Sequence, residues 1–147
     1  MMPRYPIAPF LLGLIAATLL VTCQQAYSAD RIGVHIASQH SEKGFNNVNP
    51  GVYVVHNGYT VGTYYNSEYR QSYYAGYTFE GKLVGPINYG LTVGAITGYA
   101  AGKVIPMVVP SIAYNDGLFG GSTRLSFVPK IQRNGAHAVH LSYEWSF

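Results

Sequence analysis

The sequence is poor in charged residues and in cysteine. Only 10% of its 147 residues are Asp, Glu, Lys or Arg, against roughly 25% in a typical soluble domain. This scarcity argues against a disordered chain, a coiled coil or a basic nucleic-acid-binding protein, and we expect no nucleic-acid partner. The single cysteine, Cys23, excludes a disulfide scaffold and a cysteine-based zinc site. A mean hydropathy of +0.09 with so few charges predicts an outer surface that does not face water.

Long apolar runs are also absent, except for one near the N-terminus. Pro9–Thr22 is apolar, an arginine precedes it, and Ala26-Tyr27-Ser28 supplies small residues for cleavage. This arrangement predicts a secretory signal peptide over residues 1–28 and one mature domain over 29–147. The run is shorter than the roughly 20 residues of a transmembrane helix. A lipoprotein anchored through Cys23 remains an alternative.

The C-terminal segment alternates strictly between apolar and polar residues. Its apolar series is Val139, Leu141, Tyr143, Trp145 and Phe147. Period-two alternation predicts a β-strand with one apolar face. Together with the export signal, the aromatic content of 14% and the terminal Phe, it favours an outer-membrane barrel whose apolar face contacts lipid. We therefore predict an all-β fold, an antiparallel transmembrane β-barrel of the bacterial outer membrane.

Strand-like segments follow one another at spacings that suit a meander. We predict eight strands, an even number typical of such barrels, at Arg31–His40, Gly51–His56, Tyr59–Asn66, Arg70–Phe79, Pro86–Thr97, Ile105–Tyr114, Ser122–Ile131 and His137–Phe147. Asn57-Gly58 is a strong signal for a two-residue hairpin turn, and Glu80–Gly85 is interpreted as a connection. Both termini are expected on the periplasmic side.

Chemistry in such a barrel is expected near the outer rim, because eight strands normally leave no pore. Ile32, Val34 and Ile36 share the lipid face, so His35 should point inward. His40 ends the same strand, and Asn66 and Ser67 end another strand on the same side. A histidine there could accept the Ser67 hydroxyl proton and make the serine a nucleophile for acyl transfer.

Four segments in order resemble one family of outer-membrane enzymes, the lipid A palmitoyltransferases. In Asn66–Tyr77, the Ser67 position is followed, after seven residues, by Ala-Gly-Tyr, which is the family's spacing. Gly90–Gly94 is similar to the family's next strand. Pro106–Pro110 and Leu125–Pro129 resemble its proline-flanked sixth and seventh strands.

The resemblance implies transfer of a fatty acyl chain from a glycerophospholipid to lipid A. We also expect a monomer without metal or cofactor that is inserted by the outer-membrane assembly machinery. It points to Ser67 and to a histidine, with His35 and His40 both open. Asn66 stands where the family has an aspartate, so a carboxylate that could orient the histidine is missing. The family's N-terminal amphipathic helix has no counterpart in the mature chain.

Three prolines and two lumen positions are candidates for substrate binding. Proline cannot donate to a strand ladder, so Pro110 and Pro129 on adjacent strands could open the wall to lipid. Pro50 has a family-like place at the start of the second strand. Parity puts Gly76 and Thr78 in the lumen, and Thr78 occupies the place of the family glycine at the floor of the acyl well. We therefore expect an acyl group shorter than palmitate.

Two other functions stay open. One is a non-catalytic small barrel used in adhesion, surface exclusion or membrane integrity, which would have a polar, filled interior. The other is a lipid A deacylase, disfavoured because no His-Ser pair is expected at neighbouring inward positions of one late strand. His140 and Glu144 share a lumen face, where we expect them to pack rather than to catalyse.

Overall fold

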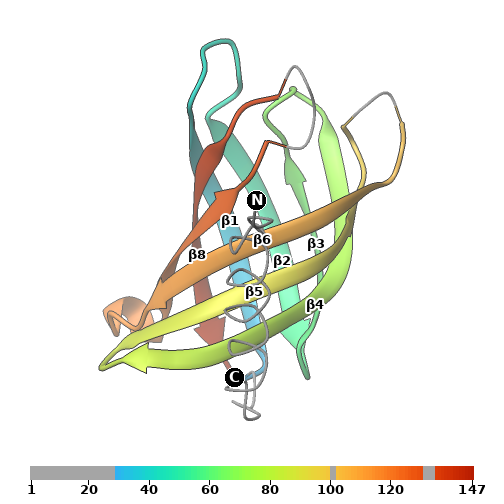
Figure 1. Cartoon of the computed structure of the whole chain (residues 1–147). Helices are drawn as coiled ribbons and strands as arrows, with labels where there is room; N and C mark the ends of the chain where they lie inside the picture. Colours follow the sequence, from blue (N-terminus) through green and yellow to red (C-terminus); the bar gives the residue numbers. More distant parts are fainter. Residues whose placement is uncertain (1–28, 100–101, 131–134) are drawn as a thin grey trace, which may run out of the picture.

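The computed structural model describes residues 29–99, 102–130 and 135–147, and the predicted signal peptide with Cys23 lies outside them. The fold is all-β, as predicted: eight antiparallel strands close into one barrel in sequence order (Figure 1). The strands are β1 (Arg31–His40), β2 (Val48–His56), β3 (Tyr59–Tyr65), β4 (Gln71–Val84), β5 (Ile87–Ile96), β6 (Ile105–Tyr114), β7 (Ser122–Val128) and β8 (Ala138–Ser146), with a short 3₁₀ turn η1 (Leu118–Gly120). Within these residues no helix is long and apolar enough to cross a membrane.

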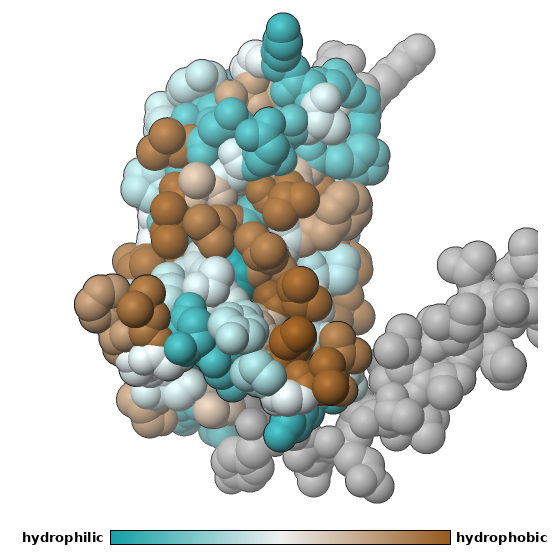
Figure 2. Space-filling model, turned by 90° about the vertical axis from the view of Figure 1, so that its left-hand side faces the viewer, coloured by the Kyte–Doolittle hydropathy of each residue, from teal (hydrophilic) through white to brown (hydrophobic). Residues whose placement is uncertain are grey.

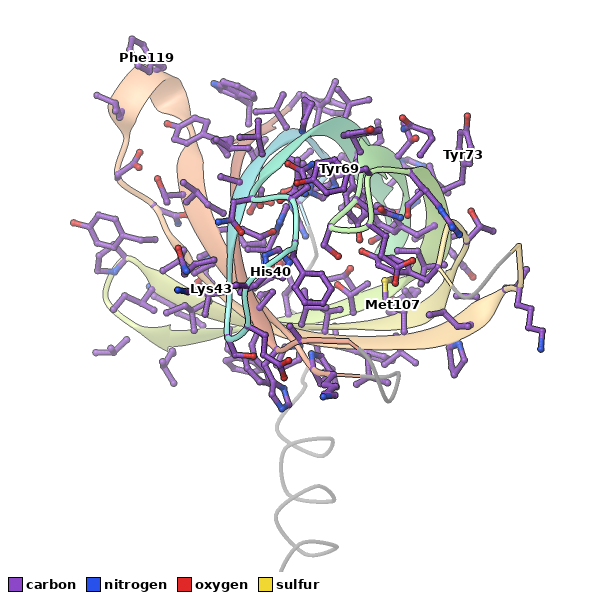
Figure 3. The ribbon with its side chains drawn as sticks, turned by 90° about the horizontal axis from the view of Figure 1, so that it is seen from above. His40, Lys43, Tyr69, Tyr73, Met107 and Phe119 are labelled. Carbon is purple, nitrogen blue, oxygen red and sulfur yellow. The ribbon has the colours of Figure 1, made fainter. Side chains whose placement is uncertain are left out.

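Side chains alternate between the lumen and the outer surface, as the period of two requires. On β8, His140 and Glu144 are 8% and 4% exposed, whereas Val139 is 48% exposed. Seen from the loop end, Tyr73 lies outside the ring of strands and Met107 inside it (Figure 3). One face of the barrel carries apolar side chains over its middle and lower parts, with hydrophilic side chains gathered at the loop end (Figure 2).

β1 and β6 have the predicted bounds, and β3, β5 and β8 differ from theirs by one residue at one or both ends. β2, β4 and β7 differ by three to five residues at one end. The largest error is Glu80–Gly85, predicted as a connection. The ladder between β4 and β5 continues instead to Val84, which pairs with Ile87, so that the turn has only two residues. Gly85 supplies the left-handed conformation of this turn with φ +53°, which glycine adopts at little cost. The Asn57-Gly58 turn is confirmed.

A β-bulge interrupts β1 at Ile36. His35 pairs with Ser142 and Ala37 with Leu141, so a two-residue step on β1 faces a one-residue step on β8. Because an extra residue reverses the parity of everything after it, His35 and Ser38 both point into the lumen. The strict alternation read from the sequence would have placed Ser38 outside.

The wall between β6 and β7 is paired only over its lower half. The ladder runs from Tyr114 and Thr123 up to Ser111 and Ser126 and then stops, although β6 continues to Ile105 and stays paired with β5. Pro110, the next residue of β6, has no backbone N–H to donate. In Figure 1 the upper part of β6 diverges from β7 and β8. The break lies where the two prolines predicted it.

Four charged residues fill the lower lumen. Glu80 accepts two hydrogen bonds from Arg31, at 2.7 and 2.9 Å, and also contacts Arg124. Glu144 contacts both arginines, at 3.0 Å and 2.8 Å. All four come from different strands and are nearly buried. This charged quartet therefore closes the turn end of the barrel.

Candidate functional site

A cavity of about 150 Å³ occupies the lumen above the charged quartet. Its lining includes the sequence-predicted residues His35, His40, Ser67, Thr78 and Pro129. The cavity also touches residues from both edges of the unpaired wall, Val109 of β6 and Val128 of β7. It therefore reaches from the loop end to the break in the ladder.

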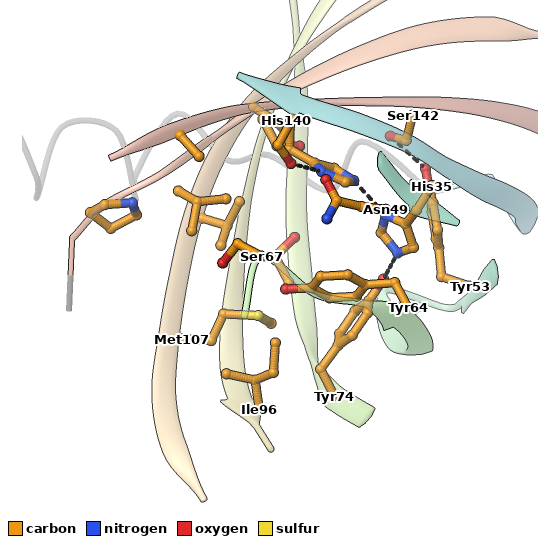
Figure 4. Close-up of a pocket in the computed structure, with 18 of the residues that line it drawn as sticks. His35, Asn49, Tyr53, Tyr64, Ser67, Tyr74, Ile96, Met107, His140 and Ser142 are labelled. Atoms are coloured by element: carbon orange, nitrogen blue, oxygen red, sulfur yellow. Dashed lines mark hydrogen bonds between the residues drawn. The ribbon is translucent and has the colours of Figure 1, made fainter. Parts of the chain in front are cut away.

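A chain of hydrogen bonds crosses the inner part of this cavity (Figure 4). Ser38 Oγ lies 2.7 Å from His140 Nδ1, and His140 Nε2 lies 2.8 Å from His35 Nδ1. His35 Nε2 lies 2.8 Å from the Tyr74 hydroxyl. We call these four residues the inner relay. A serine bonded to a histidine that a third group orients is the general arrangement of an activated nucleophile.

Tyrosine rings hold the inner relay in place. The His35 ring centroid lies 4.9 Å from that of Tyr53 and 5.0 Å from that of Tyr64. The Tyr74 ring fits only because its neighbour on β3 is Gly62, where a Cβ atom would come within 2.5 Å of that ring. Close packing of this kind fixes side-chain rotamers. The inner relay is thus preorganised by its surroundings.

The predicted residues Ser67 and His40 lie at the outer rim. His40 Nδ1 lies 2.7 Å from Asn47 Oδ1, and the His40 ring stacks on Phe45. The adjacent Asn46 donates its backbone N–H to the Ser67 carbonyl at 2.9 Å. Within the described part of the chain no hydrogen bond joins Ser67 to His35 or His40. The rim thus brings serine and histidine to one mouth without pairing them.

Tyr99 stands beside Ser67 at this rim. Its hydroxyl lies 3.0 Å from that of Tyr64. Burial raises the pKa of the Tyr99 phenol, while hydrogen bonding with Tyr64 and Ser67 works in the opposite direction. The phenol is therefore protonated at neutral pH and can donate a hydrogen bond.

Asn66 holds the rim backbone together. Its side chain is fully buried and donates to Ser72 Oγ at 2.9 Å and to the Gly98 carbonyl at 3.1 Å. Its oxygen accepts the backbone N–H groups of Glu68 and Arg70. These contacts shape the loop that carries Ser67 and leave Asn66 with no contact to a histidine.

The register predicted for β4 is confirmed. Thr78 is 3% exposed and lines the cavity, and its Oγ1 lies 2.7 Å from that of Thr60 and 2.9 Å from that of Thr92. Gly76 pairs with Gly94, and a Cβ atom there would come within 2.4 Å of the Val93 carbonyl. Gly76 therefore serves the close approach of β4 and β5, whereas Thr78 borders the space that a ligand could fill.

The prolines differ in their position. Pro110 is exposed on β6 at the end of the β6–β7 ladder, and Pro129 follows β7 and lines the cavity. Pro50 lies inside β2, not at its start as predicted, since β2 begins at Val48. The side chain of the adjacent Asn49 donates to the Tyr65 carbonyl at 3.0 Å, across the stretch where Pro50 has no N–H.

Asn49 also carries an orphaned acceptor. The side chain is 1% exposed and lines the cavity, and its Oδ1 has no hydrogen-bond partner among the described residues. Its Nδ2 faces two carbonyl oxygens, those of Asn46 and Tyr65, which fixes the orientation of the amide. A buried acceptor of this kind is costly unless something donates to it.

Sequence reasoning missed Ser38 and Tyr74, and it assigned His140 to packing. The bulge hid Ser38, whereas Tyr74 and His140 already stood at predicted inward positions. The argument against a deacylase was also wrong, because His140 and Ser142 are both buried at neighbouring inward positions of β8. His140, however, bonds to Ser38 and His35, and Ser142 interacts with Tyr53.

No protein-family model matches the chain, and no curated protein matches it. Among the described residues no group of three or more His, Cys, Asp or Glu side chains could hold a metal ion.

Proposed function

We propose that the protein is an acyltransferase of the bacterial outer membrane that moves a fatty acyl chain from a glycerophospholipid to lipid A. The observation that carries the proposal is the cavity, which joins serine and histidine side chains to an unpaired stretch of barrel wall. The order of sequence segments that resemble the lipid A palmitoyltransferases supports the same reaction class.

The break between β6 and β7 gives the acyl chain a path. A chain that enters sideways from the outer leaflet passes Pro110 and Pro129 without leaving an apolar environment. Ile96, Ile105, Met107 and Val109 then line the space it enters. Since each buried methylene contributes about 0.8 kcal/mol, the cavity can hold the chain while its ester stays near the histidines.

Acyl transfer through an acyl-enzyme uses a base, a nucleophile and two successive attacks. A serine Oγ attacks the ester carbonyl and its proton passes to a histidine, which returns that proton to the departing glycerol oxygen. A lipid A hydroxyl then attacks the acyl-serine ester and gives its proton to the same histidine, which returns it to the serine. The chain ends on lipid A, and the enzyme is restored without a cofactor.

The lumen argues against a non-catalytic barrel, since only its lower part is filled by the charged quartet. A hydrolytic relative of the same chemistry, the deacylase, differs only in using water for the second attack. Mass spectrometry of lipid A separates the three possibilities. Cells with exposed phospholipid that express the protein should gain lipid A heavier by one acyl chain. A loss of one chain would indicate the deacylase, and an unchanged mass would refute the transferase.

A variant with Ser38→Ala and Ser67→Ala together is the matched control, because it removes the serine bonded to His140 and the serine at the rim and leaves the charged quartet untouched. The folded protein should be recovered from outer membranes and migrate differently on unboiled gels. Deletion of Phe147 should impair assembly more than deletion of Ala29 and Asp30. Recovery of folded protein in the soluble periplasm would contradict the proposed location.

A further inference from the structure

We propose that Ser38 is the reacting serine, with His140 as its base and His35 as the residue that positions the base. This inference rests on the proposed ester chemistry of the cavity but not on lipid A as acceptor. It differs from the sequence-based expectation that Ser67 is the reacting serine, and one labelling experiment tests both serines.

The geometry favours Ser38 over Ser67. Ser38 Oγ is 2.7 Å from His140 Nδ1, a normal hydrogen-bond length. The second nitrogen of His140 is bonded to His35, which in turn is bonded to Tyr74. When both imidazole rings are neutral, Ser38 can donate to His140 Nδ1, His140 Nε2–H to His35 Nδ1, and His35 Nε2–H to the Tyr74 hydroxyl. All three hydrogen bonds then point in the same direction. In this arrangement the serine hydroxyl donates to the basic, unprotonated nitrogen of His140.

The bulge in β1 creates this arrangement. Ser38 and His140 are directly opposite each other in the β1–β8 ladder. They touch inside the lumen only because the extra residue at Ile36 turns Ser38 inward. Bulges often re-aim side chains next to active sites. The break in the alternation therefore contributes the serine hydroxyl that the histidine pair contacts.

The acylation of Ser38 balances in atoms and charge. Ser38 Oγ attacks the carbonyl of a bound ester, and the hydroxyl proton moves to His140 Nδ1. The resulting imidazolium shares its positive charge with His35 through their hydrogen bond. His140 then protonates the departing alkoxide, and the acyl group remains on Ser38 as an ester.

Asn49 Oδ1 adds a requirement on the substrate. The orphaned oxygen lines the same cavity as the inner relay, and Figure 4 places Asn49 next to His35. Because the amide orientation is fixed, this position can only accept a hydrogen bond. We therefore expect the site to favour a lipid ester that carries a hydroxyl or amide N–H group near the scissile ester over one that lacks it.

An alkyl fluorophosphonate tests the nucleophile directly. It reacts with an activated serine by forming an O–P bond and losing fluoride, and its alkyl chain can occupy the acyl cavity. We expect the folded wild-type barrel to be labelled once, and peptide mass spectrometry to locate the label at Ser38. Ser67→Ala, the matched control, should keep the label. Labelling at Ser67, or no labelling at all, would overturn the proposal.

Variants of the histidines separate base from positioning residue. His140→Gln should slow labelling by about 10²–10⁴-fold, as loss of a general base does. His35→Gln should slow it less and shift the pH at which labelling is half-maximal, because it changes the surroundings of His140. An unchanged pH profile in His35→Gln would overturn the positioning role.

Paired esters with and without a hydroxyl next to the carbonyl test Asn49. The wild type should prefer the hydroxylated ester by about tenfold, the value of one hydrogen bond to a buried acceptor, and Asn49→Ala should lose this preference. Equal preference in both proteins would overturn the substrate assignment. Labelling of Ser38 without any change in lipid A mass would support this site while refuting the transferase.

Discussion

The inner relay and the rim of the same cavity hold the same residue types in different states. Inside, serine and histidine are hydrogen-bonded, packed between tyrosine rings and placed by a bulge. At the rim, Ser67 and His40 share a mouth but bond to Tyr99 and Asn47 instead. Preorganised groups need little reorganisation during reaction, so the inner relay is the better candidate for the proposed chemistry.

The largest expected effect is on the rate of ester cleavage, when a histidine of the inner relay, His140, and one of the rim, His40, are substituted in turn. His140→Gln should reduce ester cleavage by about 10²–10⁴-fold because it removes the base. His40→Gln should leave the rate within a few-fold, since the hydrogen bond and the ring stacking of His40 join it to Asn47 and Phe45 of the rim. A chromogenic acyl ester offered to the folded protein in detergent measures both. If His40→Gln were the more damaging change, the rim would be the reaction centre.

Charge burial distinguishes the charged quartet from the rim by its effect on stability. Glu144→Gln breaks the charged quartet and leaves Arg31 and Arg124 to share the one carboxylate of Glu80, which costs about 3–5 kcal/mol of unfolding free energy. Glu42→Gln removes a rim ion pair at 3.5 Å, whose glutamate side chain is 59% exposed, and should change stability by less than about 1 kcal/mol. Denaturation followed by the fluorescence of Trp145, the one tryptophan, compares them. Equal losses would mean that the quartet is not the main stabilising contact of the lumen.

Thr78→Gly should lengthen the preferred acyl chain. The change removes three heavy atoms from the cavity wall, and each added methylene that becomes buried contributes about 0.8 kcal/mol, or roughly a fourfold preference. Thr78→Val is the control, because it loses the hydrogen bonds to Thr60 and Thr92 but keeps the volume. Competition between esters of different length is the measurement. A wild-type preference for palmitate that Thr78→Gly leaves unchanged would put the floor elsewhere.

The smallest effect concerns entry through the wall. Pro110→Val supplies the missing N–H and should extend the β6–β7 ladder. Transfer from membrane phospholipid should then slow several-fold, whereas cleavage of a short soluble ester that enters from the loop end should not change. Equal slowing of both reactions would show that substrate does not pass this edge.

The strand pattern made the barrel predictable because alternation depends only on neighbouring residues. The inward positions of His35, Thr78 and His140 and the wall break near Pro110 followed from parity and from the missing N–H of proline. The connection at Glu80–Gly85 was wrong because the glycines in this stretch suggested a loop, while pairing across to β5 keeps it extended.

The inner relay and the charged quartet could not be predicted in the same way. Ser38 faces inward only because of the bulge, and a bulge depends on pairing with two neighbouring strands at once. Arg31 and Arg124 are far apart in sequence, and their shared partners Glu80 and Glu144 come from other strands. Such contacts depend on which strands face each other across the lumen, which alternation alone does not reveal.

The contact between Arg31 and Glu144 has a consequence for the order of folding. These residues are 113 positions apart and lie on β1 and β8, whereas every other pair of neighbouring strands is adjacent in sequence. Joining β1 to β8 must therefore overcome by far the largest loop-closure entropy. Until β1 pairs with β8, the charged groups of Arg31 and Glu144 stay hydrated. We expect the hairpins between consecutive strands to form early and the β1–β8 ladder to form last. Weakening the Arg31–Glu144 ion pair should therefore delay closure of the barrel more than it delays formation of the hairpins.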